Sequence, residues 1–140
     1  MRDYIIMTDS CCDLSQQEVE ELELTVLPLS FTIEGKTLLN TPDHADMSPE
    51  EFFAKIAAGA DCTAAAVNVG QFTDAMTSAL TAGKDILCIS FSSALSTTYQ
   101  SACIAAEDLR AEHPEAKIIV IDSLSACRGQ GMLIYRTVRE

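Results

Sequence analysis

A dense run of hydroxyl side chains follows the apolar segment 86–89. Six serine and threonine residues fall within nine positions: Ser90, Ser92, Ser93, Ser96, Thr97 and Thr98. The pattern predicts a strand, a serine loop and then a helix over 95–112. The first N–H groups of a helix are free and its dipole is positive there, so the loop could hold a carboxylate or a phosphate. Serine and threonine are also common N-cap residues, and plain capping is the alternative.

Polar residues also follow two other apolar segments that we expect to be strands. Thr8, Asp9 and Ser10 follow segment 4–7, and Asp122 and Ser123 follow segment 117–121. Ligands of open α/β sheets bind beyond the carboxyl ends of the strands, so these clusters and the serine loop are predicted to share one edge. Asp9 and Asp122 could act as an acid–base pair or hold a metal. The preferred interpretation is that they cap helices and fix the serine-bearing loops.

The elements that position these residues alternate between strands and helices. Apolar runs at 4–7, 24–29, 86–89 and 117–121 predict strands, and segments 31–33 and 37–39 predict a hairpin around Gly35. Ser15 with Glu18, and Ser48 before Pro49, are typical helix starts. Further helices are expected over 70–82 and 124–140, whereas 61–69 is a patch of small residues. The predicted fold is α/β, a mostly parallel sheet flanked by helices, with a β-hairpin after the second strand.

Composition limits the class of protein. The 140 residues are 48% apolar, which is enough for one α/β domain with a core. The net charge of −12 disfavours binding to nucleic acid, because the chain would repel phosphate backbones. No stretch reaches the roughly 18–20 apolar residues of a membrane helix, so we expect no transmembrane segment. The first residues show no cleavable signal pattern, and we expect a cytoplasmic protein.

The six cysteines form no C-x-x-C pair and have no histidine at zinc-ligand spacing. We therefore predict reduced thiols that pack as small apolar side chains, and no metal site. Adjacent Cys11 and Cys12 leave a redox-active or soft-metal pair as the alternative.

Four motifs resemble the DegV family. Met7-Thr8-Asp9-Ser10 is similar to its V-T-D-S segment, and Val26-Leu27-Pro28-Leu29 to its V-V-P-L segment. The stretch from Ser92 to Ala102 resembles S-S-x-L-S-G-T-Y-Q-S-A, and Val120-Ile121-Asp122-Ser123 with Gly129-Gln130-Gly131 resembles V-I-D-S…G-x-G. The third motif is long and specific, and together the four span the chain.

The resemblance implies a two-domain protein that holds one long-chain fatty acid and serves a bacterial fatty acid kinase as its acyl-carrying subunit. It implies that residues 1–140 form the N-terminal α/β domain, with the second lipid-binding domain absent. No catalytic residue and no cofactor other than the fatty acid ligand are expected.

The resemblance also assigns site residues by position. Ser93 is the expected carboxylate ligand, with Thr8, Asp9, Ser10, Ser92 and Ser96 in support. A family threonine that also binds the carboxylate falls at Ala64 in this chain, and neighbouring Thr63 is a candidate replacement. Thr97 stands where the family has glycine. Both departures bear on ligand identity and affinity.

The residues themselves agree with a fatty acid, because the serine loop offers neutral donors with no adjacent lysine or arginine. Leu29, Phe31, Phe91 and Leu95 are candidates for the acyl groove, although for any one of them a core residue is the preferred interpretation. A serine hydrolase would need a partner histidine, and His44 and His113 both lie in polar, turn-like segments. No G-x-S-x-G or P-loop sequence is present. Two alternatives stay open: a small-anion or phosphosugar-binding enzyme domain, and an isolated half that binds nothing.

Overall fold

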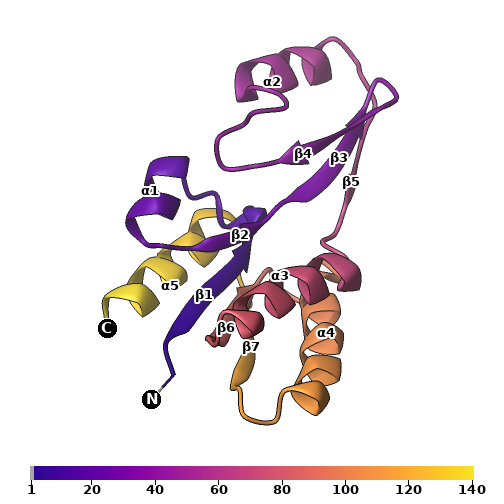
Figure 1. The fold of residues 1–140 in the computed structure, drawn as a ribbon. Coiled ribbons are helices and arrows are strands. Elements are labelled where there is room, and N and C mark those ends of the chain that lie inside the picture. Colours follow the sequence, from indigo (N-terminus) through magenta and orange to yellow (C-terminus); the bar gives the residue numbers. More distant parts are fainter. Residues whose placement is uncertain (1) are drawn as a thin grey trace.

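The computed structural model describes residues 2–140 and contains two sheets (Figure 1). The larger sheet has four parallel strands in the order β2-β1-β6-β7. These strands are β1 (Tyr4–Asp9), β2 (Thr25–Leu27), β6 (Asp85–Ser90) and β7 (Ile118–Asp122). Their carboxyl ends therefore share one edge, as predicted, and Ser90 of β6 lies opposite Asp122 of β7.

The smaller sheet is antiparallel, with the order β4-β3-β5. It consists of β3 (Leu29–Ile33), β4 (Lys36–Asn40) and β5 (Cys62–Ala65). Pro28 is the single residue between β2 and β3, which agrees with the predicted bend, since proline cannot donate to a central ladder. Figure 1 shows this sheet extending beyond the carboxyl edge of the parallel sheet and ending under α2 (Pro49–Ala57).

Helices cover both faces of the parallel sheet (Figure 1). Neighbouring strand residues point to opposite faces, so the strands supply two separate cores. Helices α3 (Val69–Thr81) and α4 (Thr98–Glu112) bury the face that carries Met7 and Cys88. Helices α1 (Gln16–Glu21) and α5 (Cys127–Arg139) bury the face that carries Ile6 and Ile89.

Helix starts follow the predicted capping chemistry in two cases. Ser15 and Glu18 form a complete capping box at α1, and Ser48 caps α2 with Pro49 in its first turn. A second capping box, Asn68 with Gln71, begins α3. These local bonds satisfy helix N–H groups that would otherwise lack partners.

Three predicted boundaries are wrong. Helix α4 begins at Thr98 rather than 95, because the N–H groups of Leu95 and Ser96 both turn back to the Ser92 carbonyl at 3.0 and 3.1 Å. The small-residue patch contains strand β5, since Cys62–Ala65 pairs with β3. Helix α5 begins at Cys127 rather than 124. Among residues 2–140, no helix is long and apolar enough to span a membrane.

Candidate functional site

Asp9 is the central acceptor at the carboxyl edge of the parallel sheet. Its Oδ1 accepts from the Cys11 N–H and from Gln130 Nε2, both at 3.2 Å. Its Oδ2 accepts from the Phe91 N–H at 2.8 Å and from the Ser90 hydroxyl at 3.2 Å. Burial raises the pKa of Asp9, and these four hydrogen bonds oppose that shift. One carboxylate thus joins the ends of β1 and β6 to α5, the loop-fixing role that the sequence predicts.

The residues on either side of Asp9 are also buried and bonded within the protein. Thr8 donates to the Ile89 carbonyl at 2.7 Å and accepts from Gln130 Nε2 at 3.0 Å. Ser10 accepts from the Leu29 N–H at 3.0 Å and from Asn40 Nδ2 at 3.3 Å. These contacts fix the strand end and its junction with the antiparallel sheet. Sequence reasoning missed Gln130, whose only signal was its place between two glycines.

Asp122 has the corresponding role at the end of β7. Its Oδ1 accepts from the Ser93 N–H at 3.1 Å and from the Leu124 N–H at 3.0 Å. The Ser93 hydroxyl and, more weakly, these N–H groups lower the pKa of Asp122. The carboxylates of Asp9 and Asp122 thus each accept hydrogen bonds from main-chain N–H groups of loops.

The serine loop, residues 91–97, is a turn that precedes α4. Ser92 is buried, and its N–H donates to the Ser125 carbonyl at 3.1 Å. Ser96 Oγ lies 2.9 Å from Thr98 Oγ1 and accepts the Thr98 N–H at 3.1 Å, so it is bonded to the first residue of α4. Ser93 is exposed at the tip of this turn. Ser92 and Ser96 therefore shape the loop, and Ser93 faces solvent.

Strand β5 separates the other two predicted ligands. Ala64 pairs with Phe31 and Thr63 pairs with Thr32, and adjacent strand residues point to opposite faces. Ala64 lines a cavity that Phe31 also lines. Thr63 lines a different hollow, together with Thr32 and Glu34. The sheet geometry therefore does not place the Thr63 hydroxyl where the Ala64 side chain lies.

An apolar groove lies between the antiparallel sheet and α2. Its volume is about 500 Å³, within the usual range of small-molecule sites. Phe31 meets Phe52 edge to face at 5.5 Å, and Phe52 meets Phe53 at 5.4 Å. Phe53 remains 67% exposed. The apolar side chains that line the groove come from the antiparallel sheet, from α2 and from the segment before α2: Leu29, Phe31, Leu39, Met47, Pro49, Phe52, Phe53, Cys62 and Ala64. Leu29 and Phe31 were predicted for it.

Hydrogen bonds through Asp9 connect the groove to the serine loop, although the residues that line the groove include none from that loop. Cys11 lines the groove, and its N–H is held by Asp9, the same carboxylate that holds the Phe91 N–H. Ser93 lies two residues after Phe91, a chain distance of at most about 7 Å. A smaller cavity of about 290 Å³, lined by Ser10, Ser15 and Arg128, shares Asp13, Asn40 and His44 with the groove.

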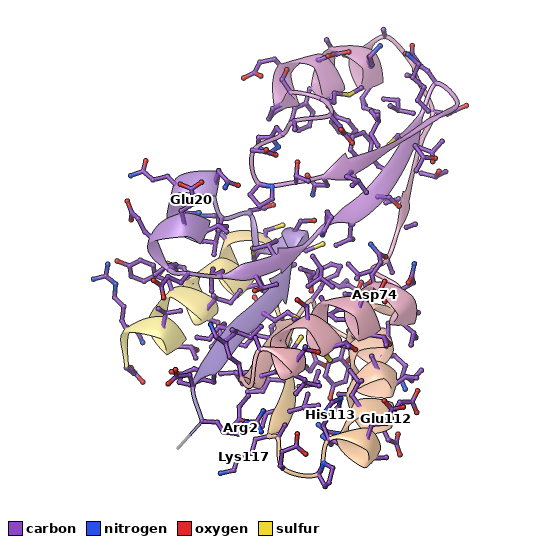
Figure 2. The ribbon with its side chains drawn as sticks, in the orientation of Figure 1. Arg2, Glu20, Asp74, Glu112, His113 and Lys117 are labelled. Carbon is purple, nitrogen blue, oxygen red and sulfur yellow. The ribbon has the colours of Figure 1, made fainter. Side chains whose placement is uncertain are left out.

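The two histidines lie in different parts of the molecule, and His44 alone of the two lines the groove. His113 precedes β7, at the amino-terminal edge of the sheet, and Figure 2 shows it with Arg2 and Lys117 at the end of the molecule opposite α2. His44 is exposed in the segment between β4 and α2 and lines the groove.

The cysteines are free thiols, and residues 2–140 contain no cluster of three or more residues that could hold a metal ion. Burial raises the pKa of Cys11 to about 12 and of Cys12 to about 11, with a smaller upward contribution from Asp9. A raised pKa keeps both thiols protonated at neutral pH, which disfavours nucleophilic or metal-ligand chemistry.

Comparisons with known proteins identify the family and the fold of the chain. A family described as "Uncharacterised protein, DegV family" matches residues 4–139. A DegV domain-containing protein of Lactococcus lactis is 39% identical over 136 residues, which are 97% of this chain and 47% of that protein. The chain thus spans about half the length of the curated relatives it matches.

Two solved structures share the fold at 28–29% identity. A stearic acid-binding protein from Eubacterium ventriosum matches with a TM-score of 0.87, over 97% of this chain and 46% of that one. A DegV family protein from Thermus thermophilus, described by its fatty acid binding, matches with a TM-score of 0.85, over 99% and 47%. The family match and the shared fold together establish that the chain belongs to the DegV family.

Proposed function

We propose that this chain binds a long-chain fatty acid, with the acyl chain in the groove between the antiparallel sheet and α2. The observation that carries the proposal is the groove itself, whose walls are mostly aliphatic and aromatic. Burial of an acyl chain contributes about 0.8 kcal/mol for each CH₂ removed from water, so such walls favour a long alkyl ligand.

The carboxylate would bind at the serine loop, with the exposed Ser93 hydroxyl as its donor. The hydrogen bonds of Asp9 to Cys11 and Phe91 support this, because they hold the groove wall and the start of that loop together. Ala64 would line the acyl chain rather than donate, since it has no hydroxyl. Thr8, Asp9, Ser10, Ser92 and Ser96 would act by fixing the loop.

The charges near the groove favour a single carboxylate over a phosphate. Among the described residues that line the groove, Asp13 and His44 are the only ones with ionisable side chains apart from the cysteines. A dianionic phosphate would need cationic partners, which the neutral hydroxyl of Ser93 does not replace. This weighs against the small-anion or phosphosugar alternative.

The protein would act as a carrier and not as an enzyme, and would present the exposed carboxylate to a separate ATP-binding kinase. The open serine turn supports this role, because a second protein could reach Ser93 from solvent. The family resemblance supplies the kinase as the partner.

The test is calorimetric titration of the full chain with oleate, and separately with inorganic phosphate. We expect saturable oleate binding that Ser93→Ala weakens about fivefold or more, as expected for the loss of one hydrogen bond to a charged group. Ser78→Ala, an exposed serine on α3, is the matched control and should bind as the original chain does.

Absence of oleate binding, or equal affinities for the Ser93 and Ser78 variants, would overturn the proposal. Saturable phosphate binding without oleate binding would favour the phosphosugar alternative.

A further inference from the structure

Asp122 connects the serine loop to the loop that follows β7. Its Oδ1 accepts two main-chain N–H groups, from Ser93 at 3.1 Å and from Leu124 at 3.0 Å. Ser93 and Leu124 are 31 positions apart in the sequence, so one carboxylate oxygen sets the relative position of two loops.

Two other bonds join the same loops, and both run between main-chain groups. The Ser92 N–H donates to the Ser125 carbonyl at 3.1 Å, and the Ser123 N–H donates to the Ser90 carbonyl at 3.0 Å. These bonds hold the base of the serine loop, where Ser90 and Ser92 are buried. The bond from Asp122 reaches one residue further, to the exposed tip.

Main-chain hydrogen bonds therefore fix the residues before Ser93. The N–H of Ser93 itself is bonded to one side chain, that of Asp122. On its C-terminal side, Ala94 donates to Ser92 Oγ and Leu95 donates to the Ser92 carbonyl, so these bonds fix the turn but not Ser93 itself.

We propose that Asp122 is a positioning residue for the head-group site: it holds the Ser93 main chain and so fixes where the hydroxyl meets the ligand carboxylate. This inference rests on the proposed function, because it assigns Asp122 a role at the same carboxylate site. Asp122 acts through Ser93 and need not touch the ligand.

The role requires an acceptor oxygen and not a charge. A nearby negative charge would repel a ligand carboxylate, so a neutral acceptor should serve equally well. Asparagine keeps an Oδ1 of the same geometry, whereas alanine leaves both N–H groups without their partner. The two substitutions therefore separate positioning from a charge effect.

The experiment measures oleate affinity of the full chain for Asp122→Ala, Asp122→Asn and Ser93→Ala, with Asp108→Ala on the exposed face of α4 as control. We expect Asp122→Ala to raise Kd about tenfold. Asp122→Asn should restore Kd to within about twofold of the original, and Asp108→Ala should leave it unchanged.

Amide hydrogen exchange provides a readout that does not depend on ligand. The Ser93 amide should exchange about tenfold faster or more in Asp122→Ala, and at nearly the original rate in Asp122→Asn. The Ser92 amide, bonded to Ser125, should stay protected in both.

Three results would overturn the inference. If Ser93→Ala weakens binding but Asp122→Ala does not, the positioning role is wrong and the proposed function stands. If Asp122→Asn loses as much affinity as Asp122→Ala, the charge matters and not the geometry. If Ser93→Ala binds oleate normally, the proposed head-group site fails, and with it any role for Asp122 there.

Discussion

At the scale of single residues, two aspartates organise the polar edge of the parallel sheet. Asp9 is fully buried and accepts four hydrogen bonds, whereas Asp122 accepts two at the surface. Both carboxylate oxygens of Asp9 accept hydrogen bonds, and Oδ1 of Asp122 accepts two loop N–H groups. These contacts fix the positions of the loops, and the proposed function assigns the ligand contact to the hydroxyl of Ser93, which also lies near Asp122.

Replacing Asp9 tests its structural role. Asp9→Ala would leave the Phe91 N–H, the Ser90 hydroxyl and the Cys11 N–H without their acceptor inside the protein. Gln130 would keep its hydrogen bond to Thr8. Each buried unsatisfied group costs about 1–3 kcal/mol, so we expect a loss of at least about 3 kcal/mol in the free energy of unfolding. Urea unfolding measures it, and Asp74→Ala on the exposed face of α3 is the control (Figure 2). A loss equal to that of the control would contradict the role.

Replacing Ala64 tests the assignment of the groove face. A threonine there would add a hydroxyl beside Phe31 and the proposed ligand, as the family resemblance implies. We expect Ala64→Thr to tighten oleate binding about fivefold, the equivalent of about 1 kcal/mol. Ala65→Thr places the same group on the other face of β5 and should have no effect. Calorimetric titration compares the two, and equal effects would show that the face is wrongly assigned.

At the scale of elements, α5 is held against the polar edge by close approach and by charge. A Cβ added at Gly131 would lie 2.5 Å from the Cys12 carbonyl oxygen, so only glycine allows the helix to pack this closely. Arg128 of α5 donates to both carboxylate oxygens of Glu18 in α1 at 2.9 and 3.0 Å. Together these contacts place Gln130 beneath Asp9.

Alanine substitutions at Gly131 and Gly129 compare a steric clash with the backbone with a steric clash with a side chain. Gly131→Ala should destabilise the protein by about 1–3 kcal/mol, because the Cys12 backbone cannot move aside easily. At Gly129 the added Cβ would lie 2.5 Å from the Ser125 hydroxyl oxygen, which can rotate away. Gly129→Ala should therefore cost less. Thermal unfolding of both variants checks the order, and the reverse order would refute the packing argument.

The pair of Glu18 with Arg128 should make stability depend on pH. Hydrogen bonds from Arg128 and Ser15 lower the pKa of Glu18 from 4.5 to about 2. A lowered pKa stabilises the fold fully above pH 4.5, and this contribution is lost as the pH falls toward 2. Arg128 is exposed, so solvent screens the pair and its contribution to stability is small.

The comparison of Glu18→Gln with the original chain measures that contribution. The variant should be slightly less stable in urea at pH 7, and the difference should vanish near pH 2. Glu20→Gln on the same helix is the control, and should show no such dependence. A difference that persists at low pH would mean that the carboxylate charge is not its source.

At the scale of the whole molecule, the fold has a well-buried part and an open part. Helices on both faces bury the parallel sheet, whereas α2 covers the antiparallel sheet loosely, and each residue of α2 keeps some exposure (Figure 1). An aromatic contact and the ion pair of Lys55 with Glu34 at 2.7 Å join α2 to that sheet. A ligand can therefore enter the groove without disturbance of either core.

Much of the architecture could be predicted from sequence, because strand runs and helix caps are local signals. The capping box at Ser15, the bend at Pro28 and the shared edge of three polar strand ends are all confirmed. Strand β5 was missed because its small residues form a strand only through pairing with β3. The start of α4 was misplaced because the turn at Ser92 uses hydrogen bonds that helix propensity does not encode.

The site was less predictable, because it depends on contacts between parts of the chain that are distant in sequence. The serine loop and its aspartates could be identified, since their types and order are visible in the chain. The role of Gln130 depends on how closely α5 packs, and the separation of Thr63 from Ala64 depends on strand register. Tertiary geometry sets both.

The most direct test of the central claim is the labelling rate of Cys62 by a maleimide, with and without oleate, read by peptide mass spectrometry. Cys62 lines the groove, whereas Cys103 lies on α4 and has the same intermediate exposure. We predict that saturating oleate slows labelling of Cys62 at least about tenfold and leaves Cys103 unchanged, because a bound acyl chain covers the groove wall. Equal rates at Cys62 with and without oleate would contradict the account.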